Sequence, residues 1–450
     1  MTLRVRMAPS PTGYLHLGNA RTFLYNWFLA RQQEGGVNIL RIEDTDQERH
    51  IEDAIAVIHD GLRWLGIDWD EEHRQSERFD LYAAACAKLE ADGRAYWCGC
   101  TREEVDARAK ERGGPPGYDG FCRDRGLARG PGRALRFRTP DDGVTVVPDV
   151  VRGDPEFRND TIEDFVIQRA DGSPLFLLAN VVDDGDMAIT HVIRGEDHLP
   201  NTPKYLLLWD ALGYGPHPVF AHLPMIVNEK RQKLSKRRDP VALSLYREQG
   251  YLPEVMANYL ALVGWAPKDG REQMTVPEMV EAFRLEDVSK SPGFFDVQKL
   301  RAFNGDAIRA LPVERFVELA VPFLPEGTSA DLLVAVAPLV QERVAVLGEV
   351  WEQVRFLYER PDVDGAAFKA GAAEVLDGAV AVWSGCEWRA EELERSLFDW
   401  ANDRGLKAQA PVRLAVTGAS KGLPLWPSVE VLGREETVDR LRAARSRLDA

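Results

Sequence analysis

The first fifty residues constrain the fold most strongly, because two apolar runs flank a loop rich in proline and glycine. Residues 5–8 have the composition of a short strand, which the prolines and the glycine that follow prevent from continuing. We expect a helix from Asn19, its predicted N-cap, to about Gln32, and a second strand over residues 37–42. Strand, tight loop, helix and strand form half of a nucleotide-binding fold, whose phosphate site lies at the start of the helix.

The loop contains neither of the two common glycine-rich phosphate motifs, G-x-x-x-x-G-K-[ST] and G-x-G-x-x-G. A phosphate would therefore be held by His16 and by the backbone at Gly18, where the missing side chain allows close approach. The alternative is an ordinary capped helix after a loop. A second half of the site is needed to choose between these interpretations.

That second half is a basic segment far downstream, Lys233–Arg237, which follows an apolar run over residues 219–227 that we expect to be one strand. A basic cluster is usually a solvated surface or a general polyanion patch. Here it stands out because the whole chain has a formal net charge of −16. Such a chain does not bind nucleic acid through its whole surface, although a local basic face still can.

The sequence His16-Leu-Gly-Asn19, paired with Lys233-Leu-Ser-Lys-Arg237, resembles the two signature motifs of class I aminoacyl-tRNA synthetases. Four further segments resemble glutamyl-tRNA synthetases of the bacterial type, within the glutamate and glutamine subfamily: residues 41–46, 179–184, 192–197 and 201–204. The resemblance is strong from Val5 to about Asn304 and weaker towards the C-terminus.

The resemblance implies a glutamate–tRNA ligase, which activates L-glutamate with ATP and Mg²⁺ and transfers it to the 3′ end of tRNA(Glu), releasing AMP and pyrophosphate. Positioning and charge stabilisation would do most of this chemistry. The implied catalytic residues are His16, Lys233 and Lys236. The implied ATP contacts are His16, Gly18, Asn19, Asp197, Lys233, Leu234, Ser235, Lys236 and Arg237.

Glutamate presents two carboxylates and one ammonium group. By resemblance, Arg6 and Arg194 bind the carboxylates, for which a guanidinium has the matching planar geometry, and Glu43 takes the ammonium. Each arginine alone could equally form a surface salt bridge. The other implied glutamate contacts are Ala8, Ser10, Phe176 and Asn180. Phe176 departs from the family, which usually has a tyrosine there, so a hydroxyl that would contact the substrate is missing.

Cys98, Cys100 and Cys122 supply three soft metal ligands around a turn-rich stretch, and a tetrahedral zinc site needs a fourth. Some relatives carry a structural zinc with a tyrosine at the place of Tyr118, and Asp124 is the other local candidate. Three reduced cysteines without a metal are the alternative. Thr101 and Glu104 form a predicted capping box for a charged helix that ends near Arg112.

The chain has 450 residues, enough for two to four domains. We expect an α/β protein with a Rossmann-like parallel-sheet catalytic domain, residues 1–95 and 185–240, interrupted by an α+β insertion, residues 96–184. The resemblance implies that this insertion holds the acceptor end of the tRNA. An all-α connector, residues 241–310, and an all-α anticodon-binding tail, residues 311–450, would follow. The tail helices are expected near 316–324, 331–359, 365–384, 389–404 and 435–446.

No apolar run reaches 18 residues, which excludes a helical membrane span, and no signal peptide is visible. Five cysteines in a chain of this length do not form a disulfide framework, so we expect a reducing cytoplasm. We also expect a monomer, although the sequence does not settle the oligomeric state. The sequence leaves open whether tRNA(Gln) is a second substrate. Arg343 aligns loosely with the family's anticodon-reading arginine, and an exposed helix arginine is the alternative.

Two other functions remain to be weighed. The first is an enzyme that attaches glutamate to a tRNA base, but such relatives lack an anticodon-binding tail, so the residues beyond Pro312 count against it. The second is a non-catalytic RNA-binding protein, which has no need for His16, Lys233 and Lys236.

Overall fold

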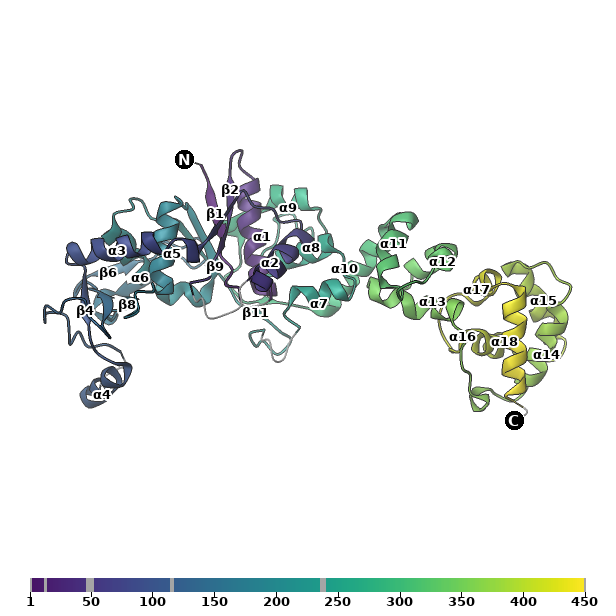
Figure 1. Ribbon diagram of the computed structural model, residues 1–450. Helices are drawn as coiled ribbons and strands as arrows, with labels where there is room; N and C mark the ends of the chain where they lie inside the picture. Colours follow the sequence, from purple (N-terminus) through teal and green to yellow (C-terminus); the bar gives the residue numbers. More distant parts are fainter. Residues whose placement is uncertain (1, 12–13, 46–51, 114–116, 235–239, 449–450) are drawn as a thin grey trace. The chain divides into compact units, whose positions relative to one another are not determined.

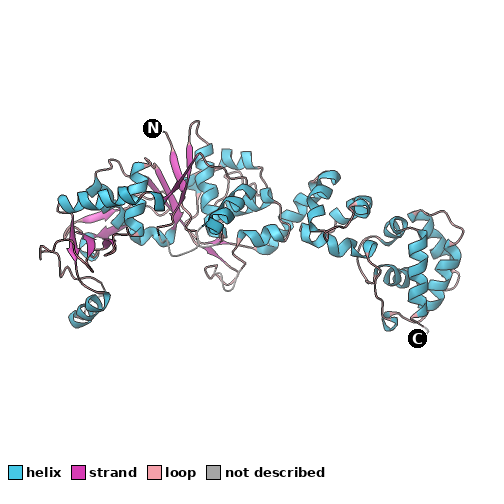
Figure 2. Cartoon of the chain, in the orientation of Figure 1, coloured by secondary structure: helices cyan, strands magenta, loops and turns pink. Residues whose placement is uncertain are grey.

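The computed structural model of the chain describes residues 2–11, 14–45, 52–113, 117–234 and 240–448. The chain divides into two compact units (Figure 1). The first comprises residues 1–246 and 253–297, and the second comprises residues 247–252 and 298–450. Figure 2 shows that the strands gather in the first unit, whereas the described residues of the second unit form helices without strands.

The first unit is built on parallel strands. β1 (Arg4–Met7) pairs in parallel with β2 (Val37–Ile42), which pairs in parallel with β3 (Glu71–Arg74). A second parallel pair joins β9 (His191–Gly195) to β10 (Val219–Leu223), and the amide of Thr190 donates to the carbonyl of Arg4, which places β9 beside β1. Buried strands with helical crossovers are typical of a parallel α/β sheet, so the predicted fold class is confirmed here.

Two local predictions at the centre of this unit are wrong. Helix α1 (Leu17–Arg31) begins after His16, which is its N-cap, and Asn19 lies in its first turn. The chain enters α1 early because the amide of Leu17 donates to the carbonyl of Val241. The run 219–227 is not one strand either, because Pro224 separates β10 from β11 (Ile226–Val227), which pairs with β12 (Gly293–Phe294).

An α+β segment interrupts the parallel strands. β4 (Ala95–Cys98), β5 (Ala134–Phe137) and β8 (Val166–Gln168) form an antiparallel sheet, and β6 (Val144–Val146) pairs with β7 (Glu156–Arg158). Helix α4 starts at the predicted capping box, in which Thr101 and Glu104 bond each other's backbone amides. Apolar side chains of β5, α5 and α6 share one core with β9 and β10, so the segment is packed firmly onto the parallel strands.

The helices of the first unit carry purple to teal colours in Figure 1. Their bounds are α1 (Leu17–Arg31), α2 (Glu52–Trp64), α3 (Phe79–Ala91), α4 (Arg102–Arg112), α5 (Phe176–Asp186), α6 (Thr202–Leu212), α7 (Leu243–Glu248), α8 (Pro253–Leu262) and α9 (Val276–Ala282). No helix in the described part of the chain is long and apolar enough to cross a membrane.

The second unit is helical, as predicted. Its helices are α10 (Val297–Ala310), α11 (Val313–Ala320), α12 (Asp331–Gln341), α13 (Val350–Tyr358), α14 (Ala372–Trp383), α15 (Ala390–Asn402), α16 (Gln409–Thr417), α17 (Leu425–Leu432) and α18 (Arg434–Ser446). Apolar side chains of α14 to α18 form a core of their own. The predicted list of helices lacked α16 and α17, which are short and lie next to glycine- and proline-rich turns.

The single helix predicted over residues 331–359 is wrong, because the chain leaves the helical path between α12 and α13. Tertiary partners take the backbone groups there: the Asn304 side chain donates to the carbonyl of Ala345, and the Glu349 carboxylate accepts from the Ala345 amide. The amide of Leu347 donates to the carbonyl of Gly250. These contacts replace helical hydrogen bonds, and local sequence preferences do not reveal them.

Candidate active site

A cavity of about 370 Å³ lies where the C-terminal ends of β1, β2, β9 and β10 meet the start of α1. This edge of a parallel sheet is where α/β folds bind their ligands. Its lining includes twelve residues predicted from the sequence: Arg6, Ala8, His16, Gly18, Asn19, Glu43, Phe176, Asn180, Arg194, Asp197, Lys233 and Leu234. The two halves of the expected site therefore do converge on one cavity.

Four further residues were predicted for the ATP and glutamate sites: Ser10, Ser235, Lys236 and Arg237. Ser10 is exposed and does not line the cavity. Ser235, Lys236 and Arg237 lie outside the described residues, so their predicted roles are not tested by the structure.

His16 and Lys233 belong to segments far apart in the sequence. His16 ends the loop before α1 and forms an antiparallel β-bridge with Ala242, a residue that follows the basic segment. The ammonium of Lys233 lies 3.8 Å from a carboxylate oxygen of Asp197, another lining residue. A Cβ on Gly18 would meet no described atom within 4 Å, so the backbone there is open to close approach.

Arg6 is held by a buried ion-pair network beneath the cavity. Its Nε donates to Oδ1 of Asp184 at 3.1 Å, and Nη1 of Arg41 donates to the same oxygen at 2.5 Å. Tyr205 donates to the other oxygen at 3.0 Å. Burial alone would raise the pKa of Asp184, but the charges of Arg41 and Arg6 outweigh it and lower the pKa. Asp184 therefore stays ionised and fixes both guanidinium groups.

Arg41 also orients two residues of the cavity. Its Nη2 donates to Oδ1 of Asn180 at 2.8 Å and to Oε1 of Glu43 at 3.2 Å. Burial raises the pKa of Glu43 even though Arg41 and Arg6 oppose it. A carboxylate in this setting gains from a cationic ligand, because an added positive charge compensates its lost hydration.

Arg194 is also buried, but its hydrogen bonds reach neutral groups. Nε donates to Nε2 of His222 at 3.2 Å, and Nη2 donates to the hydroxyl of Thr202 at 2.9 Å. Burial, together with the nearby charge of Arg6, lowers the pKa of Arg194 to about 10. The guanidinium remains charged at neutral pH, and a bound anion would offset the free-energy cost of burying that charge.

Sequence reasoning missed several lining residues. Arg21 of α1 is buried and donates to the carbonyls of Pro224 and Val263, which holds the helix against the turn after β10. Glu196 accepts from the amide of Met225 at 2.7 Å. The ring of His198 stacks on Phe176 with a centroid distance of 5.8 Å. His198 follows directly after the recognised segment 192–197, and that proximity is the signal that could have found it.

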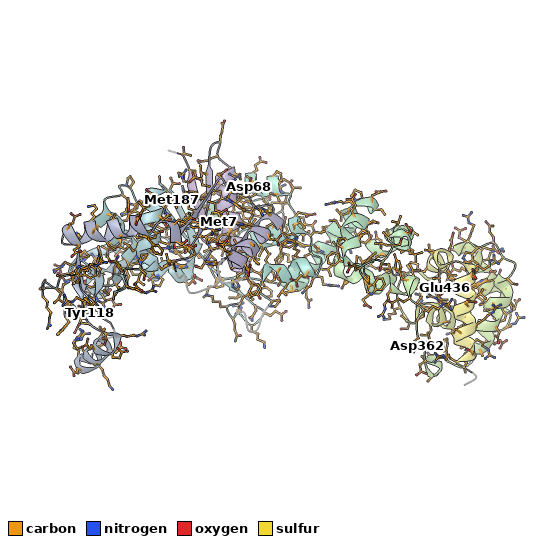
Figure 3. All side chains as sticks on the ribbon, viewed as in Figure 1. Met7, Asp68, Tyr118, Met187, Asp362 and Glu436 are labelled. Atoms are coloured by element: carbon orange, nitrogen blue, oxygen red, sulfur yellow. The ribbon has the colours of Figure 1, made fainter. Side chains whose placement is uncertain are left out.

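The three cysteines predicted as metal ligands lie together. The sulfur atoms of Cys98, Cys100 and Cys122 are all within 4.8 Å of one another. The hydroxyl of Tyr118 lies 3.5 Å from the sulfur of Cys98, and Figure 3 labels Tyr118 beside α4, away from Met7 in the parallel sheet. Asp124, the other candidate ligand, instead pairs with Arg138 at 2.7 Å and is largely exposed.

Arg343 lies in the second unit on the segment between α12 and α13, where it is exposed. Its charge lowers the pKa of the neighbouring Arg413, in addition to the effect of burial. Two arginines near each other form a local positive site, although the whole chain is acidic.

Comparison with known proteins decides the family. Residues 2–302 match the family model described as tRNA synthetases class I (E and Q), catalytic domain, and residues 315–445 match the model of an anticodon binding domain. The chain belongs to the class I tRNA synthetases of the E and Q group. The family, fold class and enzyme class predicted from the sequence are thus confirmed.

Members of this family resemble the chain along its whole length. It is 54% identical to a glutamate–tRNA ligase of Salinispora arenicola over 100% of both chains. It is 55% identical to a glutamate–tRNA ligase of Frankia casuarinae, with 99% of this chain and 98% of the relative covered. A crystal structure of a glutamate tRNA ligase from Elizabethkingia meningosepticum in complex with its amino acid superposes with a TM-score of 0.88 at 31% identity, covering 100% of both chains.

Proposed function

We propose that this chain is a glutamate–tRNA ligase. In the first step the carboxylate of L-glutamate attacks the α-phosphorus of ATP, which forms glutamyl-adenylate and releases pyrophosphate. In the second step a hydroxyl of the terminal ribose of tRNA(Glu) attacks the carbonyl of the adenylate, which releases AMP. The observation that carries the proposal is one cavity lined by two buried arginines, a buried carboxylate, residues 16–19 of the first signature motif, and Lys233 and Leu234 of the second.

The activation step needs positioned charge. In this proposal His16 and the first turn of α1 receive the ATP phosphates, as the positive end of a helix dipole favours. Lys233, which shares the cavity with His16, and Lys236 of the same motif offset the charge that develops as pyrophosphate departs. Mg²⁺ accompanies the ATP phosphates, as is usual for this ion.

In this proposal the amino acid binds in the same cavity. Arg6 and Arg194 bind the two carboxylates of glutamate, and Glu43 binds its ammonium group. Ala8, Asn180 and Phe176 complete the surface, as lining residues of the cavity. Ser10 remains a prediction from the resemblance. A glutamine side chain offers a neutral amide in place of the second carboxylate and would compensate less of the buried positive charge of Arg6 and Arg194, so the charge of the pocket favours glutamate.

We further propose which segments of the chain bind the tRNA and which residues hold a metal ion. Residues 96–184 hold the acceptor end of the tRNA, and residues 241–310 form the connector between the catalytic domain and the tail. The helical residues 311–450 bind the anticodon, with Arg343 among the contacts. Cys98, Cys100, Cys122 and Tyr118 hold a structural zinc. A tetrahedral zinc at about 2.3 Å from each sulfur separates the sulfurs by roughly 3.8 Å, and the sulfurs of Cys100 and Cys122 lie 3.5 Å apart.

We also propose the compartment and the oligomeric state in which the enzyme works. We place the reaction in the cytoplasm, a reducing compartment that suits five cysteines without a disulfide between them. We propose that the enzyme acts as a monomer.

Glutamate-dependent exchange of pyrophosphate into ATP tests the activation step, measured with and without tRNA. Charging of purified tRNA(Glu) and tRNA(Gln) side by side tests the second step and the range of substrates. Charging of tRNA(Glu) with glutamate is expected. Absence of both exchange and charging would contradict the proposal. Substitution of Lys236 by alanine should slow charging by roughly a hundredfold, because one stabilising donor is lost.

A further inference from the structure

The surroundings of Arg194 differ from those of the other buried arginines near the cavity. Arg6 and Arg41 each share a carboxylate, that of Asp184. In the described part of the chain, Arg194 forms no ion pair, and its two hydrogen bonds reach a histidine nitrogen and a threonine hydroxyl. These two contacts engage two of the five N–H donors of the guanidinium. The protein thus orients this cation without a direct ion pair, and the nearby carboxylates Asp184 and Glu43 compensate its charge only in part.

His222 can accept from Arg194 only in one protonation state. Its Nε2 faces both the Nε of Arg194, at 3.2 Å, and the hydroxyl of Thr202, at 2.9 Å. A proton on Nε2 would set two N–H donors against each other. Nε2 must therefore carry its lone pair, and the ring proton must sit on Nδ1.

Asp149 selects that state. Its Oδ2 lies 2.6 Å from Nδ1 of His222 and also accepts from the backbone amide of His222 at 2.9 Å. Its other oxygen accepts from the amides of Val151 and Arg152. The carboxylate and the ring are both fully buried. With four donors around it, Asp149 cannot turn away, so it holds the proton on Nδ1 and fixes the ring plane.

The turn that carries Asp149 is attached firmly to β10. The amide of Val150 donates to the carbonyl of Phe220, and Nε of Arg152 donates to the carbonyl of His222. Arg152 also pairs at 2.5 Å with Glu196, a residue that lines the cavity. The turn, β10 and the cavity wall therefore form one rigid support behind Arg194.

We propose that Asp149 and His222 are positioning residues for glutamate binding: Asp149 holds His222 neutral with its proton on Nδ1, and Nε2 of His222 aims Arg194 at a carboxylate of glutamate. The inference rests on the proposed function. A neutral acceptor is the suitable support here. A carboxylate at the place of His222 would pair with Arg194 and compete with the substrate, whereas an imidazole orients the guanidinium without cancelling its charge.

The test compares steady-state charging of tRNA(Glu) by the full-length wild type and its variants, with glutamate and ATP varied in turn. His222→Leu keeps the volume and removes the acceptor. It should raise the KM for glutamate roughly tenfold or more, as expected for a lost hydrogen bond to a charged group, while kcat and the KM for ATP stay within about twofold of the wild type. His222→Gln places an amide oxygen near Nε2 and should recover most of the glutamate affinity.

His217→Leu is the matched control, because His217 makes the same kind of contact with Asp210, at 2.7 Å, on the surface of the same unit. It should leave both KM values unchanged. Thr202→Val removes the second acceptor of Arg194 without changing shape, and should raise the KM for glutamate severalfold. If His222→Leu does not fold, the KM values for glutamate of Thr202→Val and His222→Gln still test the proposal.

The proposal is overturned if folded His222→Leu binds glutamate as the wild type does, or if neither Thr202→Val nor His222→Gln behaves as stated. A fall in kcat with equal rises in both KM values, and no recovery in His222→Gln, would also overturn it, since a general packing defect acts in that way. A wild type that does not charge tRNA(Glu) at all would instead contradict the proposed function, so the two failures are distinguishable.

Discussion

Phe176 lines the cavity at the position where the resemblance drawn from the sequence leads us to expect a tyrosine. The side chain lies at the start of α5 and is 38% exposed, and its ring stacks on His198. A tyrosine at this position would extend a hydroxyl from a ring that already lines the cavity. The stack leaves the ring few alternative positions, so the added hydroxyl should be well placed.

Phe176→Tyr should therefore lower the KM for glutamate by roughly twofold to tenfold, the effect of one neutral hydrogen bond. The KM for ATP should not change, which makes it the internal control. Steady-state charging of tRNA(Glu) measures both constants. An unchanged KM for glutamate would mean that a hydroxyl at this position does not reach the amino acid.

His198 should make the fold sensitive to mild acid. Burial, with the nearby charge of Arg194, lowers the pKa of His198 to about 4. In the unfolded chain a histidine takes up its proton near pH 6.5. Between these two values the unfolded state binds more protons than the folded state, so stability falls as pH decreases from about 6.5 to about 4.

Thermal unfolding of the wild type and of His198→Gln across this pH range measures the effect. The melting temperature of the wild type should fall more steeply with acid, because glutamine takes up no proton. Burial also lowers the pKa of His222, which contributes to the slope in both proteins. Parallel curves for the two proteins would contradict the prediction.

The element with the weakest support of its own is the segment around α4. Only Ala109 of this helix is buried, and the helix starts at the Thr101 capping box directly after Cys100. The small cluster beside it consists of Cys98, Tyr118 and Cys122, with Tyr96, Cys100, Val105 and Leu127 packed against them. So few apolar side chains cannot stabilise a segment, and a metal crosslink would do so.

The purified protein is therefore expected to contain one zinc ion per chain, and Cys98→Ser to contain much less. Elemental analysis measures the metal, and limited proteolysis detects opening of residues 98–122. Cys386→Ser is the control, because Cys386 lies in the second unit outside the cluster. Full zinc content in Cys98→Ser, or none in the wild type, would contradict the proposed site.

At the scale of the whole molecule, chemistry and RNA reading belong to different units. The cavity is built from the first unit, whereas Arg343 and the separate core of α14 to α18 belong to the second. Both units carry more acidic than basic residues. The proposed RNA binding would therefore use local basic sites, and Arg343 near Arg413 is the candidate.

Arg343→Ala should lower kcat/KM for charging of tRNA(Glu) by roughly tenfold, the scale expected for loss of one base-reading arginine. The KM values for glutamate and ATP should remain as in the wild type. Arg395→Ala is the matched control, since Arg395 is an exposed helix arginine paired with Glu392 at 2.7 Å. Equal charging by both variants would leave Arg343 an ordinary surface residue.

Local signals account for the parts of the fold that the sequence predicted well. The strand, loop and helix at the N-terminus, the Thr101 capping box and the helical tail all follow from short-range preferences. The errors arose where distant groups compete for the backbone. His16 rather than Asn19 caps α1 because the Leu17 amide bonds Val241, and the predicted helix over 331–359 breaks where Asn304 and Glu349 bind Ala345.

The sequence by itself identified twelve of the residues that line the cavity, because the motifs specify residue types in a fixed order. Tertiary structure alone decided how those groups are supported. Nothing in the order of residues indicates that Asp184 joins Arg6 to Arg41, or that Asp149 and His222 stand behind Arg194. Such partners lie far apart along the chain, and only the packing of β1, β9 and β10 brings them within hydrogen-bonding distance.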